Sequence, residues 1–263
     1  MTFQVLTGGG GLSGWALLNR TSARQRELVG SDGAVQSATS NFSRKIASVS
    51  TADELLSDYR LMEVALKAFG LEGDMGNKAF IRKILESDLS DEKSLANRLS
   101  NKTYRQLAET FGFGSESGAQ TDTKGFAERI TAQYVDREFE SRVGDGDQNL
   151  RLALNARREL SGLATRQSTE DTKWYEVLGN TALRKVFEGA FGFSSAYGKL
   201  PIDRQLQEFK GAAQKMFGTS EMSAIAQPDN FEKLVQRFLV RSAIDVDSAP
   251  NRYSTALTLL SGM

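Results

Sequence analysis

The stretches LMEVALKAFGL (residues 61–71) and LRKVFEGAFGF (residues 183–193) decide the fold class, because the second repeats the apolar pattern of the first. In each stretch four apolar residues step i, i+3, i+4 and i+7 before a phenylalanine and a glycine, which is the spacing of one helical face. They are Leu61, Val64, Ala65 and Ala68 in the first stretch, and Leu183, Val186, Phe187 and Ala190 in the second. Downstream, the same spacing relates Tyr104, Leu107, Ala108 and Phe111 to Phe231, Leu234, Val235 and Phe238. The sequence therefore predicts an all-α protein with two related multi-helix modules.

The rest of the chain divides around these modules by composition. Residues 1–49 form an N-terminal lead with a flexible Gly/Ser-rich start (1–14), a short helix (15–28) and a linker (30–41). Helical module one is expected at 50–114, a helical-pair insert at 115–170, and helical module two with a C-terminal helix at 171–263.

Local signals place the individual helices. Thr51 or Ser50 can cap a helix that ends at Phe69, with Gly70 as its stop signal. Further helices are expected at about 77–86, from Ser90 onward, and at 102–111, 124–143, 148–164, 229–241 and 253–260. Loops are expected at 114–123 and 245–251, and only residues 2–6 alternate like a strand.

Composition excludes several functional classes. The chain has no histidine and no cysteine, so it cannot use Ser-His-Asp or Cys-His catalysis, and nearly all zinc sites are excluded. Lys+Arg and Asp+Glu are equal at 33 each, so the whole chain lacks the basic footprint of a nucleic-acid-binding protein. The chain contains no run of about 18 or more apolar residues, so no membrane-spanning helix is expected. The start of the sequence also lacks the basic and apolar pattern of a cleaved signal.

Gly9-x-Gly11-x-x-Gly14 matches the dinucleotide-binding fingerprint, but its context does not fit. That fingerprint requires a strand before it, and a second strand and an acidic residue about 20 positions later. Here a polar stretch and helices follow. We interpret the glycines as a flexible tether and expect no bound nucleotide and no other cofactor.

The segment Asp145-Gly-Asp147-Gln-Asn149 resembles the start of a calcium loop. Such a loop needs glycine at its sixth position and glutamate at its twelfth, where this chain has Leu150 and Ala156. We interpret the segment as a helix cap and interhelical turn, and we expect no metal site.

Two groups of residues are candidates for interaction. Arg151, Asn155 and Arg158 fall on one helical face and can clamp an acidic partner, or pair with acids of neighbouring helices. Trp15 and Leu18 near the start, and Tyr253 and Leu257 near the end, give apolar faces to segments outside the modules. These faces either dock on a partner or a second copy, or cover the modules' own cores.

The chain also resembles a known family. The resemblance rests on Gly14-Trp15 with Phe42, on residues 58–71 and 149–160, on Trp174-Tyr175, on residues 183–186 and on Gln236-Arg-Phe-Leu239. These runs are similar, in order and spacing, to a bacterial domain-of-unknown-function family. That family occurs mainly in alphaproteobacteria and is often encoded among flagellar genes. It has no established activity, so the resemblance implies a flagellar connection by gene neighbourhood alone.

These observations favour a non-enzymatic interaction or assembly protein linked to flagellum biogenesis or structure. Its expected partners are flagellar proteins or a second copy, and its expected location is the cytoplasm or the exported flagellum. Two alternatives remain: a helical protein that binds a small ligand or an oxygen-liganded metal, and an enzyme that uses carboxylates.

Overall fold

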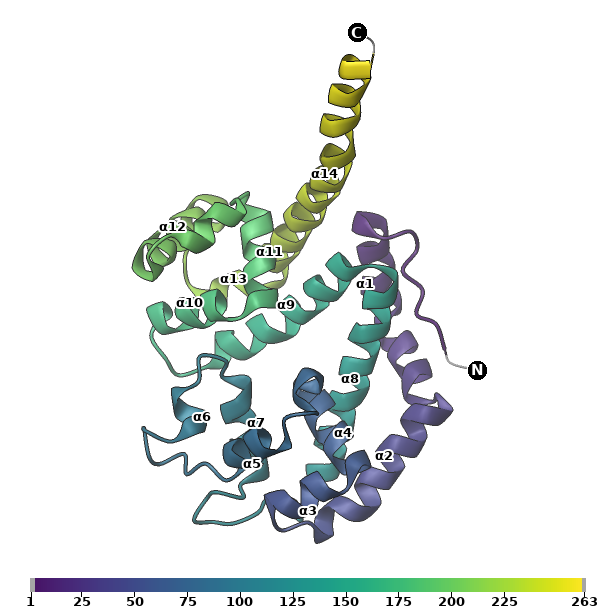
Figure 1. Ribbon diagram of the computed structural model, residues 1–263, viewed down its shortest axis with the longest axis vertical. Coiled ribbons are helices and arrows are strands. Elements are labelled where there is room, and N and C mark those ends of the chain that lie inside the picture. The colour runs from purple at the N-terminus through teal and green to yellow at the C-terminus, as the bar shows by residue number, and fades with distance from the viewer. Residues whose placement is uncertain (1–2, 262–263) are drawn as a thin grey trace. The chain divides into compact units, whose positions relative to one another are not determined.

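The computed structural model describes residues 3–261, and the side chains of residues 3–244 apart from Ser195. Within residues 3–261 there are fourteen α-helices, three short 3-10 helices and no strand (Figure 1). The all-α prediction is confirmed. Residues 3–6, the described part of the stretch that alternates like a strand, are irregular backbone.

The chain divides into two compact units. Unit 1 consists of residues 1–6 and 20–142, and unit 2 of residues 7–19 and 143–263. The divisions fall within α1 (Gly11–Gly30) and near the end of α8 (Phe126–Gly146). The segment 115–170, treated above as one helical pair, thus contributes most of α8 to unit 1 and α9 (Gln148–Thr165) to unit 2.

Unit 1 is completed by short helices. They are α2 (Gly33–Lys45), η1 (Ile46–Ser48), α3 (Ala52–Ser57), α4 (Tyr59–Phe69), η2 (Glu72–Asp74), α5 (Lys78–Leu85), α6 (Leu95–Arg98) and α7 (Thr103–Phe111). The linker expected at 30–41 is wrong, because α2 begins there and buries Val35 and Phe42. The single helix expected up to Phe69 is also wrong, since Asp58 interrupts it and caps α4 through the amides of Arg60 and Leu61.

Unit 2 contains longer helices. After α9 come α10 (Glu170–Gly179), α11 (Thr181–Phe191), η3 (Ser195–Lys199), α12 (Ile202–Phe217), α13 (Met222–Ile225) and α14 (Pro228–Ser261). The loop expected at 245–251 is wrong, because α14 runs through it without a break.

The two units share an order of elements, in line with the predicted internal repeat. The series from α2 to α7 in unit 1 corresponds to the series from α9 to α14 in unit 2. Contacts between α2 and α4, α3 and α4, α3 and α5, and α6 and α7 recur as those between α9 and α11, α10 and α11, α10 and α12, and α13 and α14. The repeated helices α4 and α11 each have eleven residues and end at a glycine in the left-handed region, with φ of 72° at Gly70 and 77° at Gly192. A residue with a Cβ is strained at such φ values, so glycine is a local stop signal in both units.

The N-terminal lead is not the loose tether that its composition predicts. In unit 1 the amide of Phe3 donates to Asp32 Oδ2 at 3.0 Å, and the amide of Leu6 donates to Gln25 Oε1 at 2.7 Å. Val5 is 6% exposed. The start of the chain is therefore held by specific hydrogen bonds and by burial.

Candidate functional site

Trp15 and Leu18 belong to the core of unit 2. Trp15 is 1% exposed and Leu18 is fully buried. The indole Nε1 of Trp15 donates to both carboxylate oxygens of Glu232 on α14, at 3.0 and 2.9 Å. The guanidinium of Arg157 lies 4.5 Å from the Trp15 ring centroid. These contacts fit the second of the two alternatives for the N-terminal segment, in which it covers a core.

The other candidates do not form an open face. Arg151, Asn155 and Arg158 lie on α9 and are all half-buried, and Arg158 pairs with the neighbouring Glu159. The side chains of Tyr253 and Leu257 lie outside the described residues.

The glycine turn before α1 holds a carboxylate. Gly8 to Gly11 all have positive φ, and the amide of Gly11, the first residue of α1, donates to Asp147 Oδ2 at 3.0 Å. Asp147 also caps α9 through the amides of Asn149 and Leu150. A phosphate bound at this turn would need the Gly11 amide as a donor, but that amide already donates to Asp147, and the negative charge of Asp147 would repel the phosphate. Added Cβ atoms at Gly10 and Gly14 would lie 2.5 Å from Asp147 Oδ2 and 2.4 Å from the Thr7 carbonyl, so these glycines serve close packing.

A cluster of charges in unit 1 is the place most like a reactive site. Lys67 Nζ lies 3.0 Å from Glu63 and 3.2 Å from Glu138. Burial lowers the pKa of Lys67, but the hydrogen bond to Glu63 and the charge of Glu138 outweigh it and raise the pKa above its ordinary value. Burial, aided by the Glu138 charge, raises the pKa of Tyr134 to about 12. Both pKa values move further above 7, so both groups stay protonated and neither serves as a proton acceptor near pH 7.

Unit 2 has a groove along α14. Its volume is about 890 Å³. We call it the α14 groove; its lining residues are Leu12, Gly189, Gly192, Phe193, Ser194, Lys233, Gln236, Arg237, Val240, Arg241 and Ile244. Helix α14 provides six of them, α11 and the residues after it four, and the first turn of α1 one.

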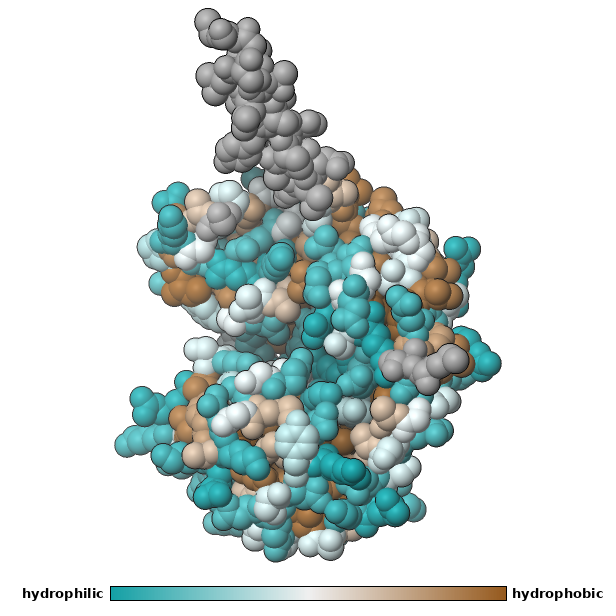
Figure 2. Space-filling view, turned by 45° about the vertical axis from the view of Figure 1, so that its right-hand side comes forward, coloured by the Kyte–Doolittle hydropathy of each residue, from teal (hydrophilic) through white to brown (hydrophobic). Residues whose placement is uncertain are grey.

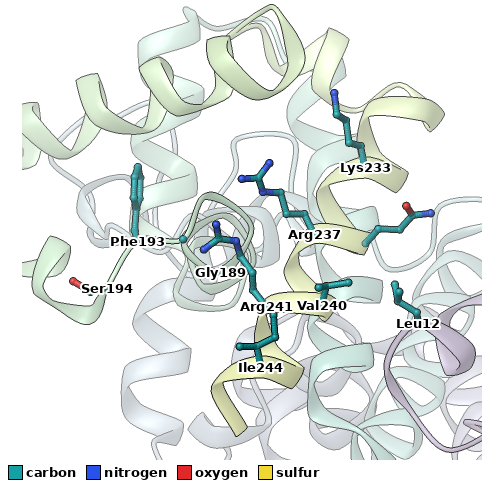
Figure 3. Close-up of a pocket in the computed structure, with 11 residues that line it drawn as sticks. Leu12, Gly189, Phe193, Ser194, Lys233, Arg237, Val240, Arg241 and Ile244 are labelled. Carbon is teal, nitrogen blue, oxygen red and sulfur yellow. The ribbon is translucent and has the colours of Figure 1, made fainter. Parts of the chain in front are cut away.

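Three cations follow one another along the groove, one helical turn apart. Lys233, Arg237 and Arg241 are spaced i, i+4 and i+8 on α14, so they share one face of the helix. The Lys233 ammonium donates to the Met216 carbonyl at 2.8 Å, near the end of α12, where a cation is favoured by the helix dipole. Arg237 and Arg241 extend from α14 toward the side of Gly189 and Phe193 (Figure 3).

The missing side chain of Gly192 makes room for Arg241. A Cβ on Gly192 would lie 2.0 Å from Arg241 Nη1 and 2.6 Å from its Cζ. The guanidinium therefore lies against the backbone that ends α11. This close approach gives Gly192 a second role besides stopping the helix.

Apolar side chains accompany the cations. Leu12, Val240 and Ile244 are 45%, 43% and 56% exposed, whereas Phe238 and Leu239 just before them are buried. The face drawn in Figure 2 shows groups of hydrophobic residues within a largely hydrophilic surface. The α14 groove thus combines positive charge with exposed aliphatic surface, a composition suited to an amphipathic acidic ligand.

Metal clusters and membrane-spanning helices are both absent from the part of the chain that the structure describes. No three His, Cys, Asp or Glu side chains there are grouped so that they could hold a metal ion. Among the same residues, none of the helices has the length and apolarity needed to cross a membrane.

Comparison with known proteins places the chain in a family. The model of the family described as "Protein of unknown function (DUF1217)" matches residues 68–234, more than half of the 263 residues. The chain belongs to this family. No curated protein matches the chain. It is similar to the crystal structure of Protein AGR_C_984 from Agrobacterium tumefaciens, with 26% sequence identity and a TM-score of 0.75 over 92% of this chain and 98% of that one. This DUF1217 member thus shares its helical fold with a protein of nearly the same extent.

The α14 groove was missed by the sequence analysis. The i, i+4, i+8 cations lie within the expected helix 229–241 and were visible as a pattern. Leu12 and Gly192 lie far from them in sequence, however, and only the tertiary structure brings them to the same groove.

Proposed function

We propose that this protein is a non-enzymatic interaction or assembly protein that acts in flagellum biogenesis or structure. The observation that carries the interaction role is the α14 groove, where exposed aliphatic side chains and cations lie together. Exposed apolar surface of this kind is unfavourable in isolation and is typical of recognition surfaces. The flagellar part rests on the resemblance to a family often encoded among flagellar genes.

The charge cluster in unit 1 is consistent with a structural role. The raised pKa values of Lys67 and Tyr134 argue against either group as a general base at neutral pH. The ion pair between Lys67 and Glu138 joins α4 to α8, and Lys67 also pairs with Glu63 along α4.

The proposal is tested by crosslinking in the organism that encodes the chain. We expect crosslinked flagellar components to be recovered with the native protein, and a deletion strain to assemble fewer or abnormal flagella by electron microscopy. Normal flagella together with the absence of any flagellar crosslink would show that the flagellar role is wrong. Saturable turnover of a small substrate by the purified protein would show that the non-enzymatic assignment is wrong.

A further inference from the structure

We propose that the α14 groove binds an acidic amphipathic helix of a partner protein, with Arg237 and Arg241 as the charge-recognition residues. This inference rests on the proposed interaction function and specifies where the partner binds and what its chemistry is.

Arg237 and Arg241 have no counterion among the side chains that the structure describes. Arg237 and Arg241 lie one turn apart, and like charges at this spacing repel each other. Neither guanidinium forms an ion pair or hydrogen bond with another residue in the described part of the chain. A carboxylate placed between them would accept hydrogen bonds from both and remove the repulsion.

The two units differ in how an arginine at the stop glycine of the repeated helix is satisfied. In unit 1 an arginine also lies at the glycine that ends the repeated helix: a Cβ on Gly70 would be 3.0 Å from Arg137 Cζ. Arg137 donates to the Phe69 carbonyl at 3.2 Å and lies 3.7 Å from Glu140. The arginine at the stop glycine of unit 1 comes from α8 and is neutralised there, whereas Arg241 at the stop glycine of unit 2 comes from α14 and lines the groove.

The length and the apolar pattern of the groove fit a helical occupant. The lining residues of α14 run from Lys233 to Ile244, twelve positions or about 18 Å of helix, which matches roughly three turns of a partner helix. Val240 and Ile244 are spaced i, i+4, so their exposed side chains form a short aliphatic row beside the cations. Leu12 extends this apolar surface from α1 (Figure 3). A helix that carries leucines on one face and glutamates beside them complements both features.

The experiment measures fluorescence anisotropy of three labelled helical peptides of about 18 residues, or roughly 27 Å. The first has leucines on one face flanked by glutamates, the second has lysines in place of the glutamates, and the third has the acidic composition with leucines spread around the helix. We expect only the first to bind saturably to the full chain. We also expect its Kd to rise with salt, because exposed charge pairs are screened.

The decisive variant is Arg237→Glu/Arg241→Glu. We expect it to raise the Kd of the first peptide by at least about 10-fold. The matched control is Lys185→Glu/Lys215→Glu, which makes the same change in net charge at two exposed lysines of α11 and α12 outside the groove. A second variant, Arg237→Gln/Arg241→Gln, removes the charges without reversing them, and circular dichroism confirms that each variant is folded.

Several outcomes would overturn the inference. Equal binding of the three peptides, or equal weakening by the groove and control variants, would show that the groove does not recognise an acidic helix. Binding of inorganic phosphate that depends on Arg237 and Arg241, with no peptide binding, would make this a small-anion site instead. In cells, crosslinks that persist at wild-type yield in the Arg237→Glu/Arg241→Glu strain would refute the groove and leave the interaction function standing. Complete absence of crosslinks in the wild type would refute the function itself.

Discussion

Replacement of Trp15 by alanine tests whether the N-terminal helix is part of the core of unit 2. Truncation of a fully buried tryptophan costs about 3–5 kcal/mol. Trp15 is 1% exposed, and its loss also removes the Nε1 hydrogen bonds to Glu232, worth about another 1 kcal/mol. Because Asn19 and Gln236 also donate to Glu232, its carboxylate is not left bare. We therefore expect a total loss of about 4–6 kcal/mol.

The assay is urea denaturation followed by the fluorescence of Trp174, the remaining one of two tryptophans and a buried residue of unit 2. Thermal unfolding should show a fall in Tm of roughly 10 °C or more for a chain of this size. The control is Leu12→Ala on the same helix, where 45% exposure predicts a change within about 0.5 kcal/mol. A loss below about 1 kcal/mol for Trp15→Ala, matching the control, would refute the core assignment and favour a docking helix.

Three further predictions follow from the same structure. Phe69 is 7% exposed, so Phe69→Ala should lower the free energy of unfolding by about 3–5 kcal/mol, measured by chemical denaturation. Phe191 is half-buried, so Phe191→Ala should lower it by only about 2 kcal/mol. The reverse order of the two losses would contradict this reasoning. The hydrogen bond from the Phe3 amide is the main factor that lowers the pKa of Asp32 below 3.8, so this carboxylate stabilises the fold above about pH 4. The difference in unfolding free energy between the wild type and Asp32→Asn should shrink as the pH falls below that value. A difference that stays constant between about pH 2 and pH 6 would count against this reasoning. Adenine nucleotides should give no calorimetric signal, because Asp147 already accepts the Gly11 amide; a saturable signal that depends on the glycines would overturn this.

Helix ends were the most predictable part of the fold, because their signals are local. Gly70, Gly112, Gly192 and Gly218 each follow the last residue of a helix and adopt left-handed φ values near 70–80°. Thr51 forms the expected cap, with Glu54 completing a capping box. Such signals depend on a few neighbouring residues, so a single sequence reveals them.

The errors arose where a local pattern had more than one physical solution. Tyr59 continues the apolar period of Leu55 across Asp58, and this predicted one long helix. The new N-cap at Asp58 rotates the following residues, and Tyr59 is 58% exposed as a result. The small residues of α2 were mistaken for a linker because Val35 and Phe42 are separated by two full turns of polar and small residues.

The α14 groove could not be predicted because it depends on the difference between the two repeated units. Sequence periodicity finds what the units share, namely helices ended by Gly70 and Gly192. It does not reveal that the arginine at the first glycine is satisfied within unit 1 while Arg241 lacks a described partner. A duplicated module needs the shared features to fold, but it does not need an open cation beside exposed aliphatic side chains. The exposed cation and aliphatic side chains of the α14 groove slightly destabilise the fold in isolation, and the binding of a ligand compensates this cost. For this reason we assign the partner to the α14 groove.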